Sequence, residues 1–128
     1  MKLRIKGNSI RFRLTKSEVD YFRNFGSIEE ATSFGDVAFS YSMIVTTKSD
    51  TLTATFENGR ITLHVPAAMA REWTTTEKVG YGGEMDIGDG KFLYLLLEKD
   101  FKCLDETNED QSDNYDNPIA ALKNGNAS

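Results

Sequence analysis

Apolar and charged residues alternate in two short runs at the start of the chain. Over residues 2–6 and again over residues 10–14, apolar side chains alternate with lysine or arginine. The segment between them, residues 7–9, is Gly-Asn-Ser, which has the composition of a turn. The two runs therefore predict an amphipathic β-hairpin with one apolar face and one cationic face.

A short helix is expected directly after this hairpin, over residues 16–25. Thr15 can cap the first turn, and Glu18 can reach back to the Thr15 backbone, which is the capping-box pattern. Gly26 suits the end of the helix because glycine readily adopts the left-handed conformation found at helix C-termini. A second helix is expected over residues 67–73, opened by the proline that precedes it.

Four strands are expected between the two helices. Apolar and polar residues alternate over residues 28–34, 37–45, 52–56 and 61–65. The last two strands flank Asn58-Gly59, a dipeptide that favours a tight hairpin turn because both residues tolerate positive φ. The middle of the chain is therefore predicted to form hairpins of an antiparallel sheet.

One buried strand is expected after the second helix. Residues 92–97 are apolar at every position, as expected of a central strand that is covered on both faces. Residues 85–87 predict a short strand beside it. Gly80, Gly82 and Gly83 are expected to lie in a loop and its turns. No internal repeat is visible in the sequence.

The order of the elements predicts an α+β fold with a largely antiparallel sheet and two short helices. A curled sheet or partial barrel is the alternative, because many strands share one apolar face. The chain has 128 residues, of which 39% are hydrophobic and 27% charged, a globular composition. We expect a single α+β domain over residues 1–104. Residues 105–128 form an acidic C-terminal segment that we expect to pack partly on the domain and to fray at its end.

The cysteine content and the first residues limit the class of protein. Cys103 is the only cysteine, which excludes an internal disulfide and a multi-cysteine zinc site. The start of the chain lacks the apolar core of a signal peptide, so a cytoplasmic location is expected. The longest apolar run, residues 92–97, is too short to span a bilayer, and no membrane association is expected.

The cationic face of the first hairpin is the leading candidate site. The formal net charge of the chain is −5, although residues 1–23 carry seven Lys or Arg and only two acidic residues. Like charges on one sheet face repel, so this face needs counter-charges. An external anion could supply them, and so could Glu29, Glu30, Glu98, Asp100 or the acidic segment. The candidate anion-binding residues are Lys2, Arg4, Lys6, Arg11 and Arg13.

Two neighbouring carboxylates form a second candidate site. On an extended strand Glu98 and Asp100 would face the same side, where they could share a proton or hold a divalent metal. The acidic segment over residues 105–128 does not match the EF-hand pattern, so we expect a clasp over the basic hairpin or a solvated tail. His64 is the only histidine, and a Cys–His dyad would require Cys103. The simpler expectation is that His64 pairs with threonines of its sheet.

Three segments resemble parts of one family. They are residues 4–11 (RIKGNSIR), residues 98–104 (EKDFKCL) and residues 109–118, from EDQSD to NP. Over residues 1–118 the chain resembles an uncharacterised family of small bacterial proteins of unknown function. The resemblance implies a cytoplasmic bacterial setting and an acidic segment that belongs to the domain. It implies no activity, cofactor or catalytic residue.

These observations favour a soluble, non-catalytic binding or interaction protein. Its basic hairpin would meet an acidic protein, a small anionic ligand or its own acidic segment, and no cofactor is implied. One alternative is a small phosphate-processing enzyme in which three arginines line a pocket and two carboxylates hold a divalent metal. Another is a weak RNA-binding module, although the overall acidity argues against nucleic acid and the hairpin offers no stacking aromatic residue. The oligomeric state is left open. In the enzyme alternative the pocket residues are Arg4, Arg11 and Arg13, and the metal ligands are Glu98 and Asp100.

Overall fold

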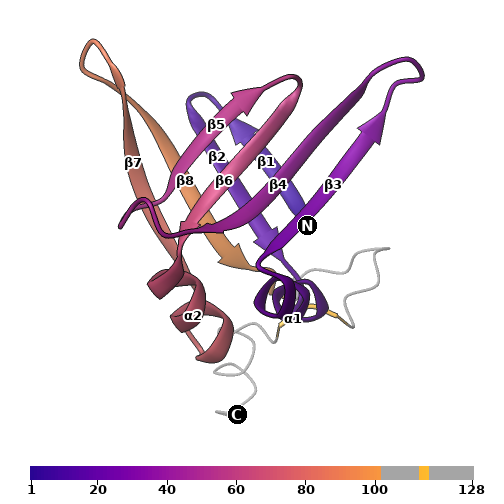
Figure 1. The fold of residues 1–128 in the computed structure, drawn as a ribbon, viewed down its shortest axis with the longest axis vertical. Coiled ribbons are helices and arrows are strands. Elements are labelled where there is room, and N and C mark those ends of the chain that lie inside the picture. Colours follow the sequence, from indigo (N-terminus) through magenta and orange to yellow (C-terminus); the bar gives the residue numbers. More distant parts are fainter. Residues whose placement is uncertain (102–112, 116–128) are drawn as a thin grey trace, which may run out of the picture.

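Two four-stranded sheets face each other, converge at one end and splay apart at the other (Figure 1). The computed structural model describes residues 1–101 and 113–115. Both helices lie at the converging end. Among the described residues, no helix is long and apolar enough to cross a membrane.

Each sheet is built from two hairpins. The first sheet has the order β1 (Lys2–Lys6), β2 (Ser9–Leu14), β8 (Lys91–Lys99) and β7 (Gly80–Gly88). The second has the order β3 (Ser27–Ser33), β4 (Ala38–Thr46), β6 (Arg60–Pro66) and β5 (Thr53–Glu57). Helix α1 (Lys16–Phe25) follows β2, and α2 (Ala67–Thr75) follows β6.

The predicted fold class is confirmed, and the sheet arrangement differs from the expectation. The outer pairs of each sheet are antiparallel, whereas the central pairs, β2 with β8 and β4 with β6, are parallel. There are two sheets rather than one, and neither is closed or strongly curled, so the partial-barrel alternative is wrong. The helices cause this arrangement, because each one carries the chain from one sheet to the other.

The structure has an internal repeat that is not visible in the sequence. The first half (β1, β2, α1, β3, β4) and the second (β5, β6, α2, β7, β8) have the same element order. Each sheet combines the leading hairpin of one half with the trailing hairpin of the other. Equivalent buried residues lie 51 positions apart, although most differ in type. The pairs are Ile10 and Ile61, Phe12 and Leu63, Leu14 and Val65, and Phe22 and Trp73.

The hydrophobic core fills the converging end of the two sheets. The side chains of Phe12, Leu14, Met43, Leu63, Val65, Leu95 and Leu97 are fully buried there. Phe22 of α1 and Trp73 of α2 close this end, with ring centroids 6.5 Å apart in an edge-to-face arrangement. Burial of each such side chain contributes about 1.5–3 kcal/mol relative to its exposure to water. The core therefore ties the helices to both sheets.

Several local predictions are confirmed. Helix α1 spans the predicted residues, its capping box is present, and Gly26 ends it with a φ of 75°. Asn58 and Gly59 form the tight turn between β5 and β6, with φ of 52° and 73°. Helix α2 continues to Thr75, beyond its expected end. Its Thr74 hydroxyl donates to the Ala70 carbonyl at 2.7 Å, a bond that the threonine-rich end of the helix makes with its own backbone.

The glycines expected in a loop belong to a long strand. Gly80 begins β7, and this nine-residue strand runs through Gly82 and Gly83 to the turn before β8. A Cβ atom at position 80 would collide with the Leu97 carbonyl oxygen of β8. Glycine at this position permits the backbones of β7 and β8 to approach closely. In a sequence, such a glycine looks the same as a glycine in a loop.

Strand β8 is central in its sheet, as predicted, but it is not covered on both faces by the described residues. Its inward residues Leu95 and Leu97 are fully buried. Tyr94, on the outer face, is 48% exposed. The all-apolar run therefore predicted the central position of β8 correctly. It predicted wrongly that the outer face of this strand would be covered.

Candidate functional site

The five predicted basic residues share the outer face of the first sheet. Antiparallel pairing of β1 with β2 places Lys2 opposite Arg13 and Arg4 opposite Arg11. The alternation of the strands sends the intervening apolar residues, among them Ile5, to the inner face, toward the second sheet. The predicted hairpin with one cationic face is therefore present.

The parallel neighbour β8 brings counter-charges to part of this face. Glu98 lies opposite Arg13 in the register of the two strands. Its Oε1 atom is 3.2 Å from Nε of Arg11 and 3.8 Å from Nε of Arg13. Asp100, which follows β8, has its Oδ2 atom 3.2 Å from Nζ of Lys2. Glu98 and Asp100 thus supply internal counter-charges to three of the five cations.

The tip of the hairpin remains strongly positive. Arg4, Lys6, Ser9 and Arg11 line a hollow of about 220 Å³. Across the part of the chain that the structure describes, no carboxylate lies within 4.0 Å of the cationic groups of Arg4 or Lys6. Two cations with no counter-charge among the described residues, and a third shared with Glu98, therefore surround one small concavity.

Tyr94 stands on the same face and was not among the predicted site residues. It lies opposite Ser9 in the register of β8 with β2, and its backbone N–H donates to the Asn8 carbonyl at 3.0 Å. Successive side chains of a strand alternate between its two faces, so the sequence of residues 92–97 could have shown that Tyr94 points outward. The partner strand of β8 was not predictable, so the sequence could not place Tyr94 beside the basic residues.

Glu98 and Asp100 lie close to basic groups rather than in an acidic cluster. The side chain of Asp100 is only 7% exposed, and its backbone N–H donates to the Leu14 carbonyl at 2.8 Å. Within residues 1–101 and 113–115, no three His, Cys, Asp or Glu side chains come together in a group that could hold a metal ion. A cation bound by this pair would have to compete with Lys2, Arg11 and Arg13.

His64 belongs to β6 of the second sheet, whereas the basic residues belong to the first. His64 Nε2 is 3.1 Å from the Thr55 hydroxyl, in agreement with the expected threonine partner. Cys103 and most of residues 105–128 lie outside the described residues. The predicted clasp over the basic hairpin and the predicted fraying of the end fall in that part of the chain. Of the acidic segment, Asp113 contacts α1, and the Tyr115 N–H donates to the Asp100 carbonyl at 2.8 Å.

Comparison with known proteins places the chain in a family. No curated protein and no solved structure matches it. The expected resemblance to a family of unknown function is confirmed, and the match extends from the basic hairpin through most of the acidic segment. The model of the DUF7009 family, a family of unknown function, matches residues 1–119, and the protein belongs to that family.

Proposed function

We propose that this protein is a non-catalytic binding protein that holds a small anionic group, phosphate or carboxylate, at the tip of its basic hairpin. The observation that carries the proposal is the unequal pairing of the cationic face. Glu98 and Asp100 offset the charge of Lys2, Arg11 and Arg13, whereas Arg4 and Lys6 face a hollow without a described carboxylate.

The chemistry of the hollow supports this assignment. Arg4 and Arg11 lie directly opposite each other on paired strands, where like charges are unfavourable. An anion between them offsets that repulsion, and a guanidinium group binds phosphate or carboxylate through two parallel hydrogen bonds. Ser9 adds a neutral hydroxyl donor to the same hollow. The volume of about 220 Å³ suits a single anionic group rather than a protein surface.

Two alternatives predict different behaviour. The phosphate-processing enzyme requires Glu98 and Asp100 to hold a divalent metal, so the metal would strengthen phosphate binding. The RNA-binding module gains one supporting observation, because the exposed ring of Tyr94 lies beside the hairpin. It requires oligonucleotides to bind far more tightly than inorganic phosphate. The cytoplasmic location and the acidic-protein partner stay predictions.

Isothermal titration calorimetry, with inorganic phosphate or butanoate titrated into the protein, tests the proposal. We expect the Arg4→Gln/Lys6→Gln double variant to bind either anion about tenfold more weakly than the wild type, because it lacks two charge-assisted contacts. Binding to the wild type should also weaken as the salt concentration rises. Lys48→Gln/Arg71→Gln is the matched control, because it removes the same charge from the turn between β4 and β5 and from α2.

Two results would contradict the proposal. The first is that neither anion binds the wild type at low salt. The second is that both double variants lose affinity equally, which would mean that only the net charge matters. Stronger binding of phosphate in the presence of magnesium, lost in Glu98→Gln, would favour the enzyme instead.

A further inference from the structure

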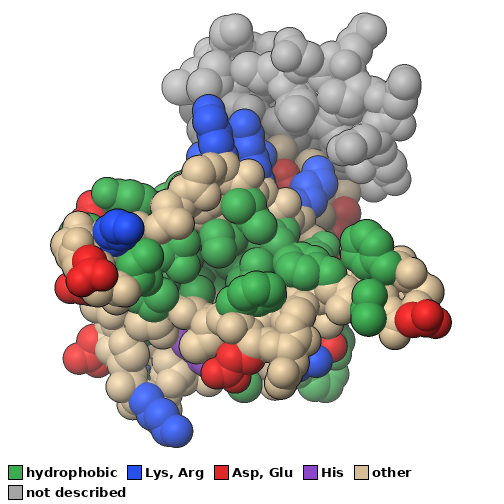
Figure 2. Space-filling model, turned by 90° about the horizontal axis from the view of Figure 1, so that it is seen from above, with side chains coloured by type: hydrophobic (Ala, Val, Ile, Leu, Met, Phe, Trp, Pro, Cys, Tyr) green, Lys and Arg blue, Asp and Glu red, His purple; other side chains and the backbone are tan. Residues whose placement is uncertain are grey.

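An apolar cleft opens between the two sheets at their splayed end. It has a volume of about 460 Å³, which is typical of small-molecule sites. Figure 2 shows hydrophobic side chains gathered across this end of the molecule, with Lys and Arg side chains along one margin. Among the described residues that line the cleft, Thr55 is the only polar one. The apolar lining residues are Ile5, Ile10, Phe39, Ala54, Phe56, Ile61, Met85 and Leu93.

Both halves of the repeat contribute equivalent residues to the cleft. Ile5 and Phe56 lie 51 positions apart, as do Ile10 and Ile61. At the converging end, Phe22 of α1 and Trp73 of α2 are buried in the core. At the splayed end Ile5 is 55% and Phe56 68% exposed. This contiguous apolar surface in a concave site favours an apolar ligand over water.

The cleft and the basic hollow lie back to back on the same hairpin. The pair Ile5 and Ile10 faces the cleft, and it lies between the pairs Arg4–Arg11 and Lys6–Ser9, which face the hollow. Strand β1 is an edge strand, and the hairpin turn lies at the open end because β2 leads into α1 at the other end. A flexible ligand can therefore pass around the hairpin without crossing a sheet.

We infer that the ligand is a single-chain amphiphile, with its hydrocarbon chain in the cleft and its phosphate or carboxylate head on Arg4 and Lys6. Charge complementarity favours this occupant over others. Among the described residues, the cleft has no charged lining residue, and the adjoining hollow has cations without a counter-charge. The inference rests on the proposed function and names its ligand class. A second copy of the chain is the competing occupant.

Titration of dodecanoate beside butanoate, below the micelle concentration, tests the inference. We expect dodecanoate to bind the wild type about tenfold or more tightly than butanoate, because each methylene buried in the cleft adds affinity. Ile5→Gln/Phe56→Gln should lose about tenfold in affinity for dodecanoate and none for butanoate. Arg4→Gln/Lys6→Gln should weaken both. Ile44→Gln, an exposed isoleucine of β4 outside the cleft lining, is the control.

The outcomes separate this inference from the proposed function. Equal affinity for dodecanoate and butanoate overturns the inference and leaves the anion site in place. An affinity for dodecanoate that is unchanged in Arg4→Gln/Lys6→Gln overturns the inference as well. If, in addition, neither phosphate nor butanoate binds the wild type, the proposed function is also overturned. A stable dimer in analytical ultracentrifugation that dissociates in Ile5→Gln/Phe56→Gln assigns the cleft to a second copy. Thermal unfolding of each variant confirms that it is folded.

Discussion

Asp113 links two parts of the molecule that are far apart in the sequence. Its Oδ1 atom accepts a hydrogen bond from the Ser17 N–H at 3.1 Å, and its Oδ2 atom accepts one from the Ser17 hydroxyl at 2.6 Å. The Lys16 N–H donates to the Asp113 carbonyl at 3.0 Å. The Asp113 carboxylate thus satisfies the Ser17 N–H, and its backbone carbonyl satisfies the Lys16 N–H. The negative charge of the carboxylate also interacts favourably with the dipole of α1.

We expect Asp113→Asn to lower the free energy of unfolding by about 0.3–1 kcal/mol at neutral pH, because asparagine keeps an acceptor oxygen but loses the negative charge at the start of α1. The hydrogen bonds from Ser17 hold the pKa of Asp113 below its ordinary range. The stabilisation is therefore present above the pKa of the unfolded state and is lost as the pH falls through the lower pKa of the folded state. Urea unfolding at neutral and at acidic pH measures both effects.

Asp36→Asn, in the exposed turn between β3 and β4, serves as the control for this change. It should leave stability within about 0.5 kcal/mol of the wild type at either pH. A difference between wild type and Asp113→Asn that stays constant down to low pH would show that the charge of Asp113 is not responsible.

At the scale of elements, β7 shows how a strand can depend on glycine. Gly80 lies against the β8 backbone, where any side chain would meet the Leu97 carbonyl oxygen. Gly83 lies in the same strand, and a Cβ there would be 3.6 Å from the Leu52 Cβ, an ordinary contact distance. The backbone of neither residue has positive φ, so the two positions differ in space rather than in backbone strain.

Gly80→Ala should therefore destabilise the protein by about 1–3 kcal/mol, as overpacking does. Gly83→Ala should be neutral or stabilise it by about 0.4–1 kcal/mol, because alanine reduces the entropy of the unfolded chain. Chemical denaturation of the two variants makes the comparison. Equal effects would mean that the approach of β7 to β8 is not the reason for glycine at position 80.

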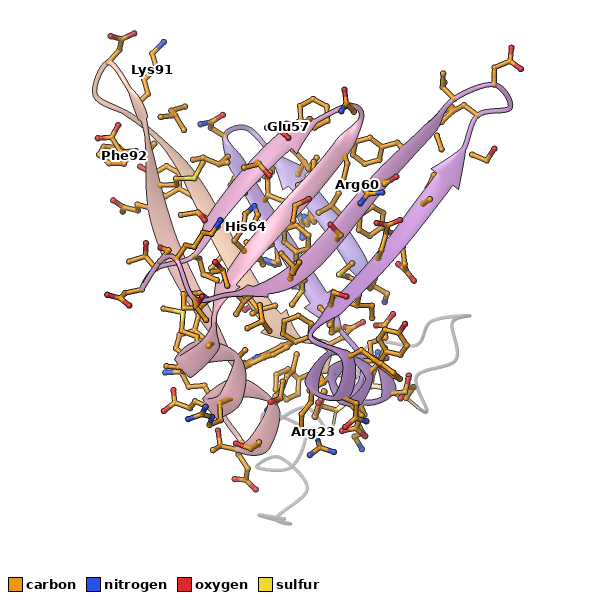
Figure 3. All side chains as sticks on the ribbon, in the orientation of Figure 1. Arg23, Glu57, Arg60, His64, Lys91 and Phe92 are labelled. Carbon is orange, nitrogen blue, oxygen red and sulfur yellow. The ribbon has the colours of Figure 1, made fainter. Side chains whose placement is uncertain are left out.

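At the scale of the whole molecule, the two halves exchange hairpins. The first sheet takes β1 and β2 from one half and β7 and β8 from the other, and the second sheet is built in the same way. The labelled side chains in Figure 3 show the resulting layout. Lys91 and Phe92 lie at the splayed end, whereas Arg23 lies beside α1 at the converging end. Neither half contains a complete sheet or a complete core.

The fragment of residues 1–50 should therefore show no cooperative thermal unfolding by circular dichroism, whereas the full chain should unfold in a single transition. The fragment of residues 51–128 should behave like the first. Mixing the two should restore a cooperative transition, because each fragment supplies the hairpins that the sheets of the other lack. A folded isolated half would contradict the interdependence of the two sheets. The physical reason is that β2 and β4 would each lose their parallel neighbour and the apolar face they cover.

The sequence by itself determined the elements whose causes lie within a few residues. The alternation over residues 2–14 specifies the basic hairpin, the capping box specifies the start of α1, and Asn58-Gly59 specifies a turn. These features depend on side-chain spacing and on local φ preferences. The five basic residues of the candidate site were predicted in the same way, as were Glu98 and Asp100 among their candidate counter-charges.

Only the tertiary structure decided which of those charges are paired and what lies behind them. The parallel pairing of β2 with β8 joins residues 9 and 94, and no local pattern encodes a contact over that separation. This register brings Glu98 to Arg11 and Arg13, leaves Arg4 and Lys6 without a described counter-charge, and sets Tyr94 beside them. The exchange of hairpins between halves likewise creates the apolar cleft, because its walls come from strands that meet only when both sheets have formed.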